Sequence, residues 1–184
     1  MEALSTPLEG LMLLRPKVFS DHRGYFFESY NAASFRAATG VSVEWVQDNE
    51  SRSDKGVLRG LHFQLPPHGQ AKLVRVVKGA VLDVCVDIRP ASPTYGQHYK
   101  LVLDGAAKEM LYIPTGFAHG FHTLEDGTIF AYKCSAYYDR SSERTIRWDD
   151  PALGIDWEAK DPVLSSKDLD GLHFAQNPWP RTDV

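Results

Sequence analysis

Short apolar segments separated by polar breaks run through most of the chain, and this pattern indicates β-strands. Lys72–Lys78 is rich in β-branched residues, and Val81–Arg89 follows it after Gly79-Ala80, so the sequence predicts a hairpin at these two small residues. Similar short runs are Tyr99–Leu103, Glu109–Ile113, Gly120–Leu124 and Thr128–Tyr138. Strands of this length and spacing predict an antiparallel sandwich or barrel.

One helix is predicted, over Ala32–Thr39. Asn31 is a favourable N-cap for it, and Gly40 is a favourable residue at its C-terminal end. The tail from Trp148 onward is rich in Pro, Asp and Gly, and we expect it to wrap around the barrel. A chain of 184 residues with this pattern predicts a single domain over residues 1–184.

Alternation within Val81–Arg89 separates an apolar face from a mixed one, because successive side chains of a strand point to opposite sides. The apolar face consists of Leu82, Val84, Val86 and Ile88. The mixed face consists of Asp83, Cys85 and Asp87. A carboxylate between apolar neighbours is costly unless it is paired. We therefore expect Asp83 to face a polar barrel interior and to hold a histidine there; the alternative is a solvent-exposed edge.

Composition narrows the class of protein. A net charge of −4 and 24% charged residues argue against nonspecific nucleic-acid binding, because phosphate neutralisation requires an excess of Lys and Arg. No apolar run approaches the ~20 residues of a membrane helix, and Glu2 and Pro7 do not fit a signal peptide. We expect a cytoplasmic protein without a membrane partner, in which Cys85 and Cys134 are buried free thiols.

The strongest chemical signal is the segment Arg59-Gly60-Leu61-His62-Phe63-Gln64, which Lys72 follows. Arginine can clamp an anion, histidine can act as a base near neutral pH, and lysine can stabilise an oxyanion. On a regular strand Arg59 would point away from His62, and a bulge at Gly60 could turn them to one side. A lone histidine in an apolar strand is usually structural, but these neighbours favour catalysis.

A metal site is the competing interpretation of His62. Residues 60–79 and Pro114–His119 resemble the two motifs of the cupin superfamily, whose metal-binding members carry His-x-His and a downstream Glu in the first motif. Here the first motif is His62-Phe63-Gln64, with no Glu between Gln64 and Gly79. His62 and His119 alone are a poor ligand set for a transition metal. We therefore expect no metal at this position.

Tyr132 and Tyr138 lie in the last apolar run. Tyrosines in strands commonly belong to the core. A phenol can also return a proton to a carbanion, and its ring can stack on a base. If the run is one regular strand, both side chains lie on the same face and could reach one cavity.

Nearly the whole chain resembles the dTDP-4-dehydrorhamnose 3,5-epimerase family. The segments that carry the resemblance are 16–19, 21–24, 27–30, 47–49, 57–64, 71–75, 84–89, 92–96, 113–121, 132–134, 148–151 and 164–168. The resemblance implies an all-β, double-stranded β-helix (jelly-roll, cupin) with a few short helices. It also implies cofactor-independent epimerisation of dTDP-4-dehydro-6-deoxy-D-glucose at carbons 3 and 5.

The same resemblance implies a role for each matching residue. His62 would be the base, oriented by Asp168; Tyr132 would be the acid; and Lys72 would stabilise the enolate. The residues matching substrate-binding positions are Arg23, Glu28, Gln47, Asn49, Arg59, His119, Glu143, Lys167 and Tyr138, the last of which would stack on thymine. The expected partners are a dTDP-sugar and a second copy of the chain, in a homodimer that exchanges N-terminal strands.

Alternatives remain open at this stage. Paralogues that epimerise only carbon 3 or only carbon 5 keep the same His, Lys and Tyr, so these residues do not choose among them. A metal-dependent cupin oxygenase and a catalytically silent nucleotide-sugar binding module are two further, less favoured classes.

Overall fold

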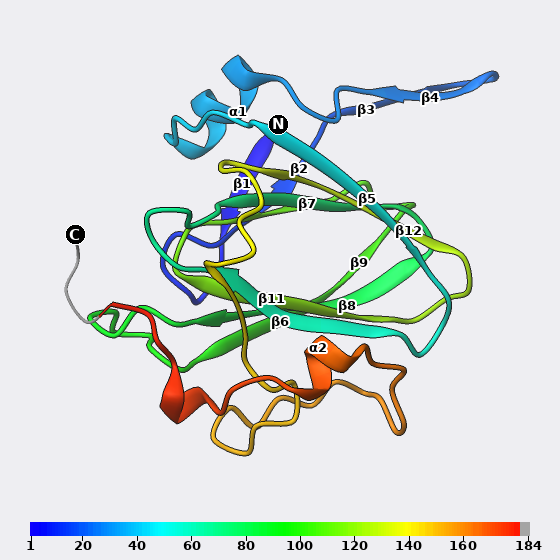
Figure 1. The fold of residues 1–184 in the computed structure, drawn as a ribbon. Coiled ribbons are helices and arrows are strands. Elements are labelled where there is room, and N and C mark those ends of the chain that lie inside the picture. Colours follow the sequence, from blue (N-terminus) through cyan, green and yellow to red (C-terminus); the bar gives the residue numbers. More distant parts are fainter. Residues whose placement is uncertain (181–184) are drawn as a thin grey trace.

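The computed structural model describes residues 1–180 and consists mainly of two antiparallel sheets that face each other (Figure 1). In spatial order the six-stranded sheet contains β1 (Glu2–Ser5), β2 (Met12–Arg15), β10 (Met110–Ile113), β7 (Lys72–Lys78), β12 (Thr128–Cys134) and β5 (Gln47–Ser53). The five-stranded sheet contains β13 (Glu143–Thr145), β6 (Leu58–Gln64), β11 (Phe117–Thr123), β8 (Ala80–Asp87) and β9 (His98–Asp104). The predicted all-β jelly roll with short helices is confirmed.

The inner faces of the two sheets form the central core. The six-stranded sheet contributes Val74, Val76 and Phe130, and the five-stranded sheet contributes Val81 and Phe121. All five are at most 5% exposed. This close packing fills part of the barrel and gives the remaining space between the sheets rigid walls.

A helix covers the outer face of the six-stranded sheet. Helix α1 (Ala32–Thr39) has the predicted bounds, with the Asn31 side chain accepting a hydrogen bond from Ser34 N and Gly40 in the left-handed conformation at φ 72°. Its Phe35 is 1% exposed and packs with residues of β7 and β10, including Met110. The helix therefore covers the apolar side chains of β7 and β10 that point away from the barrel interior.

The C-terminal segment covers the outer face of the five-stranded sheet. Leu82 and Val84 of β8 pack against Leu153 and Trp157 of this segment, which also contains α2 (Ser166–Leu169) and the 3-10 helix η1 (Phe174–Gln176). This explains why both faces of β8 are buried. Residues 181–184 of the predicted domain lie outside the described residues.

Two strand predictions need correction. Gly79 and Ala80 do not form a hairpin, because β7 pairs with β10 and β12, whereas β8 pairs with β11 and β9. Gly79, at φ 80°, turns the chain from one sheet into the other. The strand predicted over Thr128–Tyr138 ends at Cys134, so strand alternation does not place Tyr138.

A small hairpin stands apart from the barrel. β3 (Val18–Asp21) and β4 (Gly24–Phe27) pair only with each other and project beyond the two sheets (Figure 1). Phe19 is 52% exposed and Phe26 is 66% exposed. Within residues 1–180, no helix is long and apolar enough to cross a membrane.

Candidate active site

A bulge in β6 turns Arg59 and His62 toward the same space. His62 lies opposite His119 of β11, and Arg59 lies opposite Phe121, so β6 has one more residue than β11 over this interval. The bulge contains Gly60 at φ 131°, where a Cβ atom would come within 2.5 Å of Gly120 Cα. The predicted bulge is therefore confirmed, and glycine is required by both the dihedral angle and the space.

The space between the sheets at this level is a polar cavity with two connected chambers. One chamber has a volume of about 430 Å³ and the other about 200 Å³. Both are lined by His62, Lys72, Tyr132 and Lys167. The larger chamber is also lined by Gln47, Asn49, Cys134, Tyr138 and Glu143, and the smaller by Arg59, His119, Phe121 and Phe130. The structure thus brings eleven of the thirteen residues predicted for the site together, counting Asp168 through its contact with His62.

His62 is held by a buried carboxylate. Its Nε2 lies 2.7 Å from Asp168 Oδ1, and Asp168 also accepts hydrogen bonds from Gly60 N and from the Ser165 side chain. Burial opposes the charge of Asp168, but these donors outweigh burial and lower its pKa. Burial also lowers the pKa of His62, although Asp168 partly offsets this effect. His62 is thus a neutral, oriented imidazole near neutral pH.

Ser165 supports the site through Asp168, a role that the sequence pattern did not predict. It is the N-cap of α2, and its side chain and backbone amide bind Asp168 in a capping box. The pattern Ser165-x-x-Asp168 is a variant of the capping-box signature and could have revealed this pair. A short helix therefore fixes the carboxylate that orients His62.

Lys72 and Tyr132 face His62 from the opposite sheet. Lys72 is the first residue of β7, and Tyr132 is on the neighbouring strand β12. Burial lowers the pKa of Lys72 and raises the pKa of the Tyr132 phenol. The phenol therefore keeps its proton at neutral pH. An imidazole on one sheet thus faces an amine and a phenol on the other across the cavity.

A second histidine–carboxylate pair lies beside the first. His119 Nε2 is 2.9 Å from Asp83 Oδ2, and the Asp83 residue is fully buried. The prediction that Asp83 faces the interior and holds a histidine is confirmed. Asp83, Cys85 and His119 place donor atoms within 4.8 Å of one another. Asp83 already pairs with His119, and the basic side chain of Lys72 lines the same chamber as His119. We therefore assign Asp83, Cys85 and His119 to a hydrogen-bond network and not to a metal site.

The position of Tyr138 is fixed by contacts outside the strand. Gln64 Nε2 donates to Tyr137 O at 3.2 Å, and Gln64 Oε1 accepts from Asp139 N at 2.9 Å, so one amide holds both neighbours of Tyr138. The Tyr138 hydroxyl donates to Glu143 at 3.1 Å. These contacts keep the exposed ring at the mouth of the larger chamber, where strand alternation had been expected to place it.

Two hydrogen-bonded pairs of side chains complete the mouth. Lys167 Nζ donates to Glu143 Oε1 at 2.6 Å, and Gln47 Nε2 donates to Asn49 Oδ1 at 2.9 Å. The mouth therefore carries hydrogen-bonding groups of both positive and negative charge.

Both cysteines are buried and free, as predicted.

Arg23 and Glu28 do not join the cavity within one chain. Arg23 is at the tip of the β3–β4 hairpin, where its side chain is 78% exposed and pairs with Asp21. Glu28 follows β4 and accepts a hydrogen bond from Asn31 Nδ2 at 3.0 Å. Neither residue lines a chamber that contains His62.

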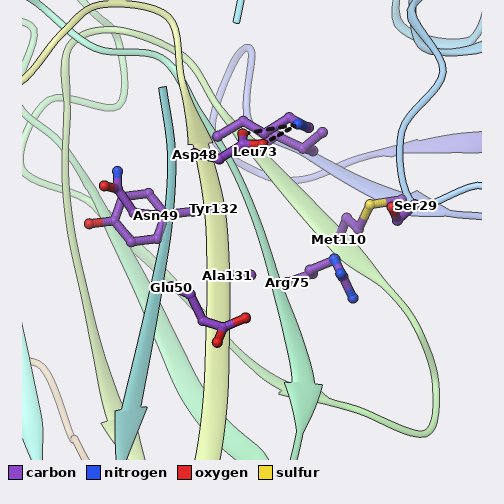
Figure 2. A pocket seen from close by; sticks show the side chains of 10 residues that line it. Ser29, Asp48, Asn49, Glu50, Leu73, Arg75, Met110, Ala131 and Tyr132 are labelled. Atoms are coloured by element: carbon purple, nitrogen blue, oxygen red, sulfur yellow. Dashed lines mark hydrogen bonds and ion pairs between the residues drawn. The ribbon is translucent and has the colours of Figure 1, made fainter. Parts of the chain in front are cut away.

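A second groove lies along the six-stranded sheet and shares Asn49 and Tyr132 with the larger chamber. Figure 2 shows Tyr132 and Asn49 together on one side of β12 and β5, with Arg75 and Met110 on the other side. The groove is also lined by Asp48, Glu50 and Lys133. It lacks His62 and Lys72, so the cavity between the sheets is the better candidate for chemistry.

Comparison with known proteins is consistent with this geometry. The family model for dTDP-4-dehydrorhamnose 3,5-epimerase matches residues 5–176. The Shigella flexneri enzyme of that name is 48% identical over 174 residues, which are 95% of this chain and 96% of that protein. A Legionella pneumophila dTDP-6-deoxy-D-glucose-3,5-epimerase, solved with dTDP-4-keto-L-rhamnose, has a TM-score of 0.94 at 43% identity and covers 100% of this chain and 99% of its own.

A further solved relative has a narrower activity. A 3'-monoepimerase from Streptomyces bikiniensis, solved with dTDP-quinovose, has a TM-score of 0.87 at 36% identity and covers 95% of this chain and 88% of its own. The fold is therefore shared by double and single epimerases. With the family model spanning most of its length, the chain belongs to the dTDP-4-dehydrorhamnose 3,5-epimerase family of isomerases.

Proposed function

We propose that the chain epimerises dTDP-4-dehydro-6-deoxy-D-glucose at carbons 3 and 5 to give dTDP-4-dehydro-L-rhamnose. The observation that carries this proposal is the placement of His62 and Tyr132 on opposite walls of one cavity, with Lys72 on the strand next to Tyr132. Inversion of a carbon requires removal of a proton on one face and delivery on the other. Two oppositely placed proton-transfer groups meet that requirement.

His62 is the base. Nε2 lies 2.7 Å from the Asp168 carboxylate, which favours the tautomer with its hydrogen on Nε2 and its lone pair on Nδ1, and this lone pair takes the proton next to the 4-keto group. In the chair form of a D-gluco sugar, the hydrogens on carbons 3 and 5 are axial and point to the same face. One base can therefore serve both carbons without a second histidine.

Lys72 stabilises the enolate. When the proton leaves, its electron pair moves onto the keto oxygen, and a buried ammonium opposes the new negative charge in a region of low dielectric. A single donor of this kind contributes a factor of about 10²–10³ in rate. No metal is needed for this step.

Tyr132 completes the reaction by returning a proton. Its phenol keeps its proton because burial raises its pKa, and it lies across the cavity from His62. The phenol donates to the carbanion carbon while the carbonyl re-forms; solvent then returns a proton to the phenolate and accepts the proton that His62 removed. Tyr138 stacks on thymine at the cavity mouth, and Arg59 and Lys167 bind the diphosphate.

The proposed assembly is a homodimer that exchanges N-terminal strands. The apolar residues Phe19 and Phe26 are exposed on the β3–β4 hairpin, and Arg23 at its tip is too far out to line the cavity of its own chain. A second copy would cover the hairpin and receive Arg23 at its site. Phe26→Asp is expected to give monomers with weaker dTDP binding, measured by light scattering and calorimetry.

Val102→Asp is the matched control for the dimer experiment, because Val102 is an exposed apolar residue too, at 50%, but lies on β9. It should remain dimeric. A Phe26→Asp protein that stays dimeric and binds dTDP normally would contradict the proposed assembly.

The test of the reaction is proton NMR of the substrate in deuterated water. Incorporation of deuterium at both carbons, with formation of the L-sugar, is the expected result. Label at one carbon supports the second candidate, a single-site epimerase, which the similarity to the Streptomyces bikiniensis 3'-monoepimerase favours. Absence of label at either carbon would refute both.

A further inference from the structure

A short segment at the mouth of the larger chamber continues beyond the end of its strand. β12 ends at Cys134, which lies opposite Lys72 of β7. Ser135 adds one more backbone contact, because its N–H donates to Ala71 O at 3.0 Å. Residues 136–139 then lie outside every strand of the part of the chain that the structure describes. Their backbone groups therefore need other hydrogen-bonding partners.

Glutamine side chains supply these partners. Gln70 Nε2 donates to Ala136 O at 2.8 Å, and Gln47 Oε1 accepts from Tyr138 N at 2.9 Å. Gln64 holds the residues on either side of Tyr138. Each residue of the segment thus has one backbone group bound by a glutamine amide.

The three glutamines come from both sheets, and all of them line the larger chamber. Gln47 is the first residue of β5, Gln64 is the last residue of β6, and Gln70 lies in the loop from β6 to β7. Gln64 is 4% exposed, and its Nε2 also donates to His68 O at 2.7 Å in that loop. Since β5 and β6 belong to different sheets, these amides tie the segment to both walls of the cavity.

The main chain of this segment determines where the Tyr138 ring lies. Tyr138 is 54% exposed, and its hydroxyl donates to Glu143 at 3.1 Å. A ring that is half exposed has little packing to hold it, so its position follows from its backbone. A backbone that is held before the ligand arrives lowers the entropic cost of binding.

We propose that Gln47, Gln64 and Gln70 form a clamp that positions Tyr138 for the base of the nucleotide. The clamp consists of these three side chains and their bonds to residues 136–139, and it acts on the ligand through the Tyr138 ring. The stacking of thymine on this ring rests on the proposed function. The hold on the backbone does not, because it is present in the ligand-free chain.

Amide hydrogen exchange tests the clamp without a ligand. The Tyr138 and Asp139 amides donate to glutamine oxygens, so they should exchange slowly at an exposed site. Gln64→Met removes the acceptor of Asp139 N and should speed its exchange about tenfold. Gln70→Met should speed both amides about threefold, and this half-buried position decides if Gln64→Met does not fold. Unchanged exchange in Gln70→Met would overturn the clamp.

Kinetics and binding separate positioning from a merely structural role. Gln70→Met should raise KM for the dTDP-sugar and Kd for dTDP about fivefold, with kcat within about twofold of wild type. The kcat is expected to persist because His62 is held by Asp168 and not by the clamp. A loss confined to kcat would contradict the proposed role.

A double-mutant cycle with Tyr138→Ala shows whether Gln70 acts through the ring. Gln70 lines the chamber, so a direct contact with the nucleotide is the competing explanation of any effect on affinity. If Gln70 acts through the ring, Gln70→Met should not change the Kd for dTDP once Tyr138 is alanine, as measured by calorimetry. Independent effects of the two substitutions on Kd would overturn the positioning role.

Gln176→Met is the matched control. Gln176 Oε1 also accepts from a backbone amide, that of His173 at 3.2 Å, but it lies in η1 and lines neither chamber. This variant should keep the wild-type KM and Kd. Equal losses of affinity in Gln176→Met and Gln70→Met would overturn the inference. A wild-type protein that does not bind dTDP would refute the proposed function, and hydrogen exchange would still test the clamp.

Discussion

Two histidine–carboxylate pairs face the same cavity from neighbouring strands, yet their surroundings differ. His62 and His119 lie opposite each other in the β6–β11 ladder, and each Nε2 is within 2.9 Å of a carboxylate oxygen. The His62 side chain is 23% exposed, whereas that of His119 is 7% exposed and stacks near Phe130. The same pair of groups can therefore be a base where it is accessible and a framework contact where it is enclosed.

The carboxylates differ in how their charge is used. Asp168 is bound by Ser165, Gly60 N and His62, and the donors lower its pKa despite burial. Asp83 is hydrogen-bonded to the His119 ring and, weakly, to the Cys85 thiol. The first carboxylate is held by three groups and orients an accessible ring, while the second is held by an enclosed ring and a weakly donating thiol.

The largest expected effect separates the two histidines. His62→Asn should abolish deuterium exchange at both carbons, a loss of about 10³–10⁴-fold, because a general base contributes a factor of that order. His119→Asn keeps an amide donor for Asp83 and should retain exchange, with an effect of about tenfold, mostly on KM. Proton NMR in deuterated water measures both. Equal losses in the two variants would break the distinction between base and framework.

The sequence could predict much of this contrast, because local rules control it. The run Lys72–Lys78 has the bounds of β7, and the alternation in β8 turns Asp83 inward. A glycine beside His62 suggested the bulge. Sequence rules could not assign consecutive strands to different sheets at Gly79, because this choice depends on which neighbours each strand finds.

Other parts of the site depend on contacts distant in sequence. Tyr138 is placed by Gln64 and Glu143 after the strand has ended, so its position does not follow from alternation. The placement of Arg23 on a projecting hairpin is likewise a property of the fold. The roles of Asp168 and Lys167 came from family resemblance, since the pattern of the tail alone does not bring them to His62.

The second largest effect concerns the group that faces His62 across the cavity. Tyr132→Phe removes the phenol proton but keeps the ring, so His62 can still form the enolate. Exchange at the carbon should continue, while formation of the inverted sugar should fall about 100-fold or more. NMR distinguishes label in recovered substrate from label in product. Parallel losses of exchange and inversion would show that Tyr132 is not the second proton-transfer group.

A smaller effect is expected from the carboxylate behind the base. Asp168→Asn leaves His62 in place but no longer favours the tautomer with its lone pair on Nδ1, so kcat should fall about 100-fold. Asp150→Asn is a suitable control, because Asp150 also pairs with a histidine, His173, at 3.2 Å away from the cavity. Its kcat should change little. A comparable loss in both variants would indicate general destabilisation.

The smallest expected effect is a shift in the pH profile. His62 acts as a base only when neutral, so kcat/KM should fall as pH drops through its pKa, which burial lowers below the ordinary value of 6.5. Because Asp168 raises this pKa, Asp168→Asn should move the acid limb further down, whereas Asp83→Asn should leave it in place. An acid limb that moves equally in both variants would show that they act on a common group, and the assignment of a separate histidine to each role would be wrong.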